Sequence, residues 1–434
     1  MAIEPFRFPH EFQAIDPAIR QETLRLASVD GFPLHGRLYL PPGETPDVAL
    51  LAMHPRADFL RHYLAPPLTA AGYAFLGACT RHLNNDADAL HERLCLDVAG
   101  AVAFLRERGF RKIVFVGNSG GGSLFAFYLQ QAARAPAERL DRAPSGDRVP
   151  LGRFELPLPD GLVLLAAHTG EGRFLLERLD PSVVDEASPT AAEPRLDMYD
   201  PTNGYRPLEE GPSSYSKDFL AEFRAGQVTR CQRLDRRALE WCEEARWHKS
   251  RLRELGDELS EADRLRHTRH GLVRRYLVIY RTLADPRYLD PSLDPSERLP
   301  GSIFSFGQDP VKGNYGEGLA RAMSARGWLS TWSGLSSRAA LGLTLPEVVL
   351  PTLMVNALGD QEIFPSEARE AYDALAAADK SFVSLPGADH YLRAMPGAPA
   401  SDDPVAPGAP ASDDPVTRLC DEWLLPWLRE RWPV

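Results

Sequence analysis

A serine set among glycines is the first feature of the chain that points to chemistry. The stretch GNSGG, residues 117–121, fits the pattern Gly-x-Ser-x-Gly. It follows an apolar run and precedes a segment with helical character. A serine on a sharp turn between a strand and a helix projects its hydroxyl above the sheet, and flanking glycines leave room for the turn. We therefore predict that Ser119 is a nucleophile. The alternative is a plain glycine turn.

A serine hydroxyl attacks well only when a base takes its proton. His390 is the best candidate, because it follows the strand-like run 380–386 in a loop that precedes the C-terminal helical segment. A carboxylate must orient such a base. Asp360 ends the apolar run 351–360 and stands thirty residues before His390, with Glu362 as the fallback. A plain turn aspartate is the alternative interpretation of Asp360.

The order Ser119, Asp360, His390 along the chain resembles that of serine hydrolases with the α/β-hydrolase fold. The resemblance covers roughly residues 20–170 and 346–434. It implies that Ser119 attacks a carbonyl, that His390 acts as general base and then as general acid, and that Asp360 orients the imidazole. It implies no metal ion and no organic cofactor. Because all three residues are present, a non-catalytic binding protein on the same fold is the less favoured interpretation.

Members of this family usually carry His-Gly after the third strand, where backbone N–H groups help to form an oxyanion hole. Here the corresponding stretch is His54-Pro55-Arg56, and a proline has no N–H to donate. The resemblance then implies that Arg56 supplies one donor and Gly120 the other, with Ala57 as the alternative to Arg56. We expect His54 to organise this loop. The Arg56 side chain is expected to form either a structural ion pair or a contact with an acidic group of a substrate.

Short apolar runs alternate with helical patterns along the parts of the chain that hold these residues. The runs cover 47–55, 73–81, 112–119, 161–170, 351–360 and 380–390. Alternation of apolar and polar residues also predicts a β-hairpin at 22–40. Continuous apolar runs between helices are typical of a parallel sheet covered on both faces. The predicted fold class is therefore α/β, with a mostly parallel sheet whose sixth strand is followed by a large insertion.

The insertion divides the chain into three expected parts. These are a first core segment at 1–170, a mainly helical cap or lid at 171–345, and a second core segment at 346–434. In the cap, the spacing predicts a long helix at roughly 217–255 and a second helix from Ser260 to about residue 284, paired as an antiparallel hairpin. Residues 396–417 hold a tandem duplication, PGAPASDDPVA followed by PGAPASDDPVT, whose composition favours a surface loop.

The cap is expected to cover the serine and to shape the substrate pocket. Its aromatic candidates near the mouth are Phe304, Phe306, Trp328 and Trp332. Plain core packing is the alternative for each of them. Further pocket candidates are His54, Asn118 and His168, the last because it ends a strand just before the cap. The aromatic content of the cap favours a small apolar or aromatic substrate.

Composition and charge limit the remaining options. The chain has 434 residues and a formal net charge of −11, which gives no general attraction to nucleic acid or to an anionic membrane. The first residues lack the pattern of a signal peptide, and no apolar run is long enough to span a bilayer. We therefore expect a cytoplasmic protein that acts on a small molecule. The five cysteines are widely spaced, as in a protein with reduced thiols and no structural zinc site.

Residues 224–281 are locally basic, although the protein as a whole is acidic. We expect a solvated helix face there, or a contact with the acidic core or with a second copy of the chain in a homodimer. A partner-binding module is the alternative. The predicted reaction is hydrolysis of a carboxylic ester through an acyl-enzyme. The same three residues also serve amides, lactones, thioesters and carbon–carbon bonds, so the fold does not choose among them.

Overall fold

A computed structural model describes residues 15–303, 309–395 and 414–434. Phe304 and Phe306, and most of the duplicated segment at 396–417, lie outside the described residues. Within the described ranges, no helix combines the length and the apolar character that crossing a bilayer requires.

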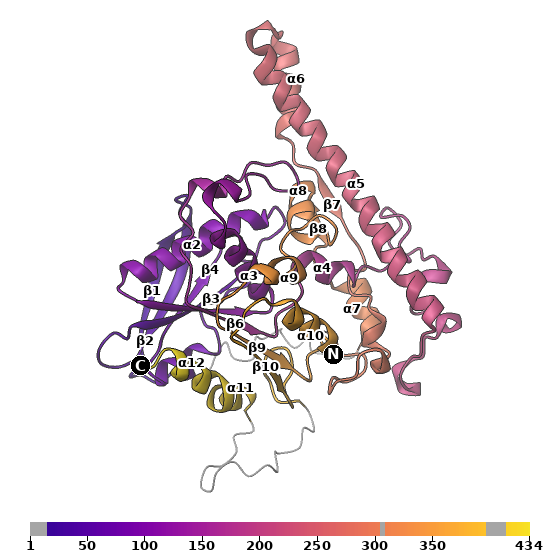
Figure 1. The fold of residues 1–434 in the computed structure, drawn as a ribbon. Coiled ribbons are helices and arrows are strands. Elements are labelled where there is room, and N and C mark those ends of the chain that lie inside the picture. Colours follow the sequence, from indigo (N-terminus) through magenta and orange to yellow (C-terminus); the bar gives the residue numbers. More distant parts are fainter. Residues whose placement is uncertain (1–14, 304–308, 396–413) are drawn as a thin grey trace.

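An eight-stranded sheet with the order β1-β2-β4-β3-β5-β6-β9-β10 forms the centre of the fold (Figure 1). β2 runs antiparallel to both of its neighbours, and all other neighbouring strands are parallel. The strands are β1 (Arg20–Ala27), β2 (Pro33–Leu40), β3 (Val48–His54), β4 (Ala74–Cys79), β5 (Lys112–Asn118), β6 (Gly161–Leu165), β9 (Thr352–Ala357) and β10 (Lys380–Leu385). The hairpin and the strands predicted from the six apolar runs are confirmed.

Helices cover both faces of the sheet, which explains why the strands are continuously apolar. Alternate residues of β3 enter two separate cores: Leu51 and Met53 lie in one, Leu50 and Ala52 in the other. The first core contains α2 (His91–Glu107), α3 (Gly120–Ala133) and α10 (Pro365–Ala374). The second contains α1 (Ala65–Ala70), α11 (Pro415–Leu419) and α12 (Leu425–Arg431). The chain has the predicted α/β-hydrolase fold.

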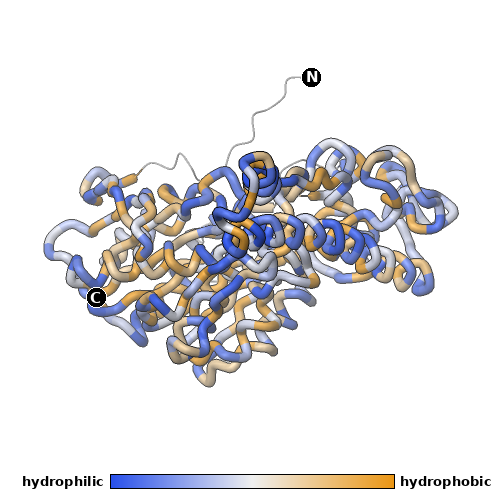
Figure 2. The backbone as a smooth tube through the Cα atoms, turned by 90° about the horizontal axis from the view of Figure 1, so that it is seen from above, coloured by the Kyte–Doolittle hydropathy of each residue, from blue (hydrophilic) through white to orange (hydrophobic). Residues whose placement is uncertain are grey.

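The chain leaves the sheet between β6 and β9, where the insertion was expected. This part contains α4 (Glu171–Leu176), α5 (Lys217–Leu255), α6 (Glu261–Leu272), α7 (Pro310–Gly316), α8 (Ala325–Gly327) and α9 (Leu341–Thr344), and the short strands β7 (Tyr276–Val278) and β8 (Ala322–Ser324). α5 begins after Ser216, whose Oγ accepts the N–H of Phe219 at 3.1 Å. The α5–α6 hairpin projects from the rest of the fold (Figure 1), and α5 is largely hydrophilic (Figure 2).

α6 is shorter than the sequence predicted, because it ends at Leu272 and not near residue 284. Its start is as expected: the Oγ of Ser260 accepts the N–H of Asp263 at 3.1 Å. After Leu272 the backbone becomes extended, and β7 pairs antiparallel with β8. Leu272 is 70% exposed whereas Leu283 is buried, so the two residues do not share one buried helical face. Apolar spacing in a short run rich in aromatic and β-branched residues fits a helix and a strand alike.

Candidate active site

Ser119 occupies a strained turn between β5 and α3. Its backbone angles are φ 53° and ψ −124°, a region that residues with a Cβ rarely adopt. The glycines around it allow a tight approach of strand and helix. A Cβ at Gly117 would lie 2.8 Å from the Cα of Gly122, and one at Gly121 would lie 2.4 Å from the carbonyl oxygen of Met53. The GNSGG stretch therefore forms the sharp turn that the sequence predicted.

The three predicted catalytic residues come together in one hydrogen-bonded chain. The Oγ of Ser119 lies 3.1 Å from the Nε2 of His390. The Nδ1 of His390 lies 2.9 Å from one carboxylate oxygen of Asp360 and 3.1 Å from the other. His390 and Asp360 are both buried. With Nδ1–H donated to the carboxylate, Nε2 is left to accept a proton from Ser119.

Asp360 is held by its own loop after β9. One of its carboxylate oxygens accepts the main-chain N–H groups of Glu362 and Ile363, at 2.7 and 2.9 Å. Glu362, the fallback candidate, is fully buried. Burial, and then the charge of Asp360, raises the pKa of Glu362 well above its usual value. Both carboxyl oxygens of Glu362 lack a hydrogen-bond partner among the described residues, whereas Asp360 contacts His390 directly.

The loop after β3 differs from the expected oxyanion hole. The N–H groups of Arg56 and Ala57, the two candidates for the second donor, both donate to the Nδ1 of His54, at 3.2 and 2.9 Å. These bonds give His54 the organising part that was expected of it. They also engage the same N–H groups that the resemblance assigned to a substrate oxygen. Either N–H can serve an oxyanion only by giving up or sharing its bond to His54.

Two imidazoles and a carboxylate line the space over Gly120. A Cβ on this glycine would lie 2.8 Å from the Nε2 of His54, 2.9 Å from the Nε2 of His168 and 2.8 Å from an oxygen of Glu171. The Nδ1 of His168 accepts the N–H of Gly170 at 3.1 Å. Because both rings accept a backbone N–H at Nδ1, the neutral form of either ring carries its proton on Nε2. Burial, and then Arg56, lowers the pKa of His54 well below its usual value, which keeps this ring neutral.

The side chain of Arg56 forms an ion pair inside the site. Its guanidinium lies 2.6 Å from Glu171 and 3.8 Å from Asp86, and it stacks over the ring of Trp332 at 4.7 Å. Burial acts to raise the pKa of Glu171, but Arg56 and His168 outweigh it and hold that pKa well below its usual value. The structural ion pair, one of the two expected uses of Arg56, is therefore present. Glu171 was not among the predicted site residues, although it follows the end of β6 at Leu165 by only a few residues.

The remaining pocket candidates have different surroundings. Trp332 is buried and joins the site through Arg56. Trp328 packs in the core of the insertion and donates its indole N–H to Asp235 at 2.7 Å. Asn118 is buried beneath the turn, where its amide donates to the carbonyl of Leu165 at 3.0 Å. Trp328 and Asn118 therefore have structural contacts of the kind that plain core packing predicts.

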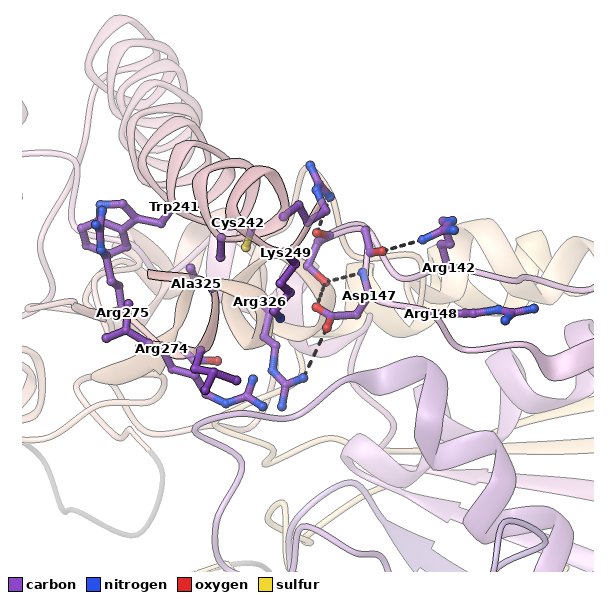
Figure 3. Close-up of a pocket in the computed structure, with 18 of the residues that line it drawn as sticks. Arg142, Asp147, Arg148, Trp241, Cys242, Lys249, Arg274, Arg275, Ala325 and Arg326 are labelled. Carbon is purple, nitrogen blue, oxygen red and sulfur yellow. Dashed lines mark hydrogen bonds and ion pairs between the residues drawn. The ribbon is translucent and has the colours of Figure 1, made fainter. Parts of the chain in front are cut away.

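A cavity of about 610 Å³ lies between the α5–α6 hairpin and the loop at residues 142–148 (Figure 3). Its walls are strongly basic, and none of the three candidate catalytic residues lines it. Some of these cations already contact the core: Arg246 donates to the carbonyl of Ser145 at 2.6 Å, and Arg274 lies 3.4 Å from Asp88. The contact of Arg274 with Asp88 is therefore of one expected kind, between the basic residues 224–281 and an acid of the core.

Comparisons with known proteins return similar folds at low sequence identity. No protein-family model and no curated protein matches the chain. The esterase domain from a Rhodothermus marinus protein matches with 14% identity and a TM-score of 0.41, over 95% of this chain and 98% of that one. The alpha/beta hydrolase GrgF from Penicillium sp. sh18 matches with 12% identity and a TM-score of 0.44, over 86% and 91%. At such values the chemistry must be argued from the residues of the site.

Proposed function

We propose that the chain is a serine hydrolase that cleaves carboxylic esters through an acyl-enzyme on Ser119. The observation that carries the proposal is the continuous chain of hydrogen bonds from Ser119 through His390 to Asp360, at a strained turn. Strain at a single residue with positive φ is costly and persists where the surrounding structure enforces it, as it does at functional sites.

In the proposed mechanism the Oγ of Ser119 attacks the ester carbonyl while the Nε2 of His390 takes its proton. Asp360 stabilises the imidazolium that results, and its two N–H bonds from the loop keep the carboxylate in place. His390 then protonates the leaving alkoxide. A water molecule then attacks the acyl group while His390 takes its proton. The bond between the acyl group and the Oγ of Ser119 breaks, His390 returns the proton to that Oγ, and the acid is released. No step requires a cofactor.

Negative charge on the substrate oxygen needs two donors in this scheme. Gly120 is the first, because its N–H belongs to the first turn of α3, where N–H groups have no partner within the helix. For the second, we propose the Nε2–H of His54, since this atom borders Gly120 and the N–H groups of Arg56 and Ala57 already donate to His54. A neutral imidazole that presents an N–H to a developing oxyanion supplies the same stabilisation as a backbone amide.

The charges of the site support a neutral substrate with an apolar or aromatic group. The cation of Arg56 faces the two carboxylates of Glu171 and Asp86, so it offers no unbalanced positive charge to an anionic substrate. The buried ring of Trp332 packs against this pair and adds an apolar wall behind it. A panel of acyl esters, anilides, lactones and thioesters tests the bond type. Esters should turn over fastest, and a clear preference for one of the other bonds would replace the ester assignment.

Labelling with a fluorophosphonate tests the nucleophile without knowledge of the substrate. The wild-type chain should be labelled, and Ser119→Ala should not. Ser384→Ala is the matched control, because this serine is exposed on β10 and has no contact with the triad. The proposal is wrong if the wild-type chain is not labelled, or if labelling survives in Ser119→Ala.

A further inference from the structure

The outer part of the α5–α6 hairpin is held together by polar residues. In α5, the last buried residue of the apolar contact with the insertion is Ala238, and beyond it His248 is the one further buried side chain. In α6 the buried residues are His267 and Gly271. Leu265 and Leu272 of α6 are 47% and 70% exposed, and Leu252 and Leu255 of α5 are only partly buried. Two helices that meet through histidines lack the apolar burial that usually stabilises such a pair.

The two helices bring ligand-type side chains to one place. Glu244 and His248 are four residues apart on α5, and His267 and His270 are three apart on α6, so that each pair shares a helix face. One donor atom from each of Glu244, His248 and His270 lies within 4.8 Å of those of the other two. The rings of His248 and His270 stack with centroids 4.5 Å apart.

His267 orients the central histidine. The Nδ1 atoms of His248 and His267 are 2.8 Å apart, so one ring donates to the other. With the proton on Nδ1 of His248, its Nε2 keeps a free lone pair. Histidine ligands of metal ions commonly donate their second ring N–H to a neighbouring acceptor in this way. Close packing at Gly271, where a Cβ would lie 3.1 Å from the Lys249 side chain, holds the two helices in register.

We propose that Glu244, His248 and His270 bind a divalent transition-metal ion, with zinc as the natural occupant, and that the ion clamps α6 onto α5. Nitrogen and carboxylate ligands in a tetrahedral arrangement suit Zn²⁺, and a small closure of the three side chains brings them to bonding distance. The sequence predicted no metal site, because its cysteines are widely spaced. This cluster is made of histidines and a glutamate that only the pairing of the helices brings together.

Arg275 competes with a metal ion for the carboxylate of Glu244. Its guanidinium holds Glu244 by two contacts, at 2.7 and 2.9 Å. Metal binding must therefore draw Glu244 away from Arg275, and removal of the arginine should tighten the binding of metal. If Glu244 does not bind the metal, removal of Arg275 should leave the affinity for metal unchanged.

The test is a titration of the full chain, purified without a histidine tag and stripped with a chelator, with Zn²⁺ alone. Calorimetry should give one Zn²⁺ per chain, and Co²⁺ should give the visible absorption of a tetrahedral complex. Glu244→Gln and His270→Gln should each raise the Kd by about 10- to 100-fold or more, and Arg275→Gln should lower it. Matched controls are Glu243→Gln on the same helix and His35→Gln on β2, both exposed side chains, which should bind as the wild type does.

Two results would overturn the proposal. One is the absence of a stoichiometric zinc complex in the wild-type chain. The other is unchanged binding in both Glu244→Gln and His270→Gln, which would place the ion elsewhere. Because the side chain of His270 is exposed and that of Glu244 is partly so, neither substitution is expected to prevent folding. Far-UV circular dichroism and fluorophosphonate labelling of each variant check this independently.

Discussion

His54 offers the sharpest test of the proposed active site, because its two ring nitrogens have separable tasks. Nδ1 accepts the N–H groups of Arg56 and Ala57, and Nε2 borders Gly120. His54→Asn places an amide oxygen near the position of Nδ1 and leaves nothing at Nε2. His54→Gln does the reverse: its amide reaches toward the position of Nε2, and the loop loses its acceptor. His54→Asn thus tests donation from Nε2 to the oxyanion, and His54→Gln tests the part of Nδ1 in organising the loop.

The expected magnitude follows from the burial of the ring. His54 is 5% exposed, so its N–H acts where water is excluded and a fixed dipole has its full effect on developing charge. Loss of one such donor costs about 3 kcal/mol, which corresponds to about 100- to 200-fold in rate. We expect His54→Asn to lose about this factor in kcat and in the rate of fluorophosphonate labelling. His54→Gln should retain more activity than His54→Asn.

The assay combines turnover of a p-nitrophenyl ester, the second-order rate of labelling and a thermal melt of each variant. The melt separates a loss of catalysis from a loss of folded protein. The order of the two variants decides the outcome. If His54→Asn is close to the wild type and His54→Gln is inactive, the loop N–H groups are the donors, as the resemblance implied, and the reasoning about Nε2 is refuted.

Three further predictions concern Asp360, Gly120 and Glu92. Asp360→Asn should lower kcat by about 10⁴-fold with little change in circular dichroism, because the amide favours the wrong tautomer of His390; a loss below tenfold would speak against this pairing. Gly120→Ala should slow labelling strongly, since its Cβ would lie 2.8 Å from His54 and Glu171. Labelling at the wild-type rate would contradict this prediction, because it would show that the side chains of His54 and Glu171 make room for the methyl group. Burial raises the pKa of Glu92 to about 7, so the folded chain keeps a proton that the unfolded chain releases above its lower pKa. Stability should therefore fall by up to about 1.4 kcal/mol per pH unit as the pH rises from about 4.5 to 7. Denaturant melts across this range should show a flatter dependence in Glu92→Gln, and an equal slope in both proteins would contradict the assignment.

Features that depend on a short stretch of sequence could be predicted from the sequence. Neighbouring residues determine the apolar runs of the strands, the turn at Ser119 and the cap of α6 at Ser260, because periodicity and backbone conformation are local properties. The rules of connection in α/β sheets then limit the possible orders of the strands without fixing one. Asp360 and His390 could be predicted because both stand at strand ends, and parallel strands bring such ends to one edge of the sheet.

Tertiary structure alone decided what those residues contact. The pairing of the Arg56 and Ala57 N–H groups with His54, and the burial of Glu171 beside them, depends on how the loop after β3 meets the start of α4. The end of α6 at Leu272 was decided by a partner strand more than forty residues away. The histidine cluster of the hairpin forms because α6 folds back along α5. In each case, contacts between segments that are distant in the chain stabilise the observed arrangement. A short stretch of sequence does not contain the information about these contacts.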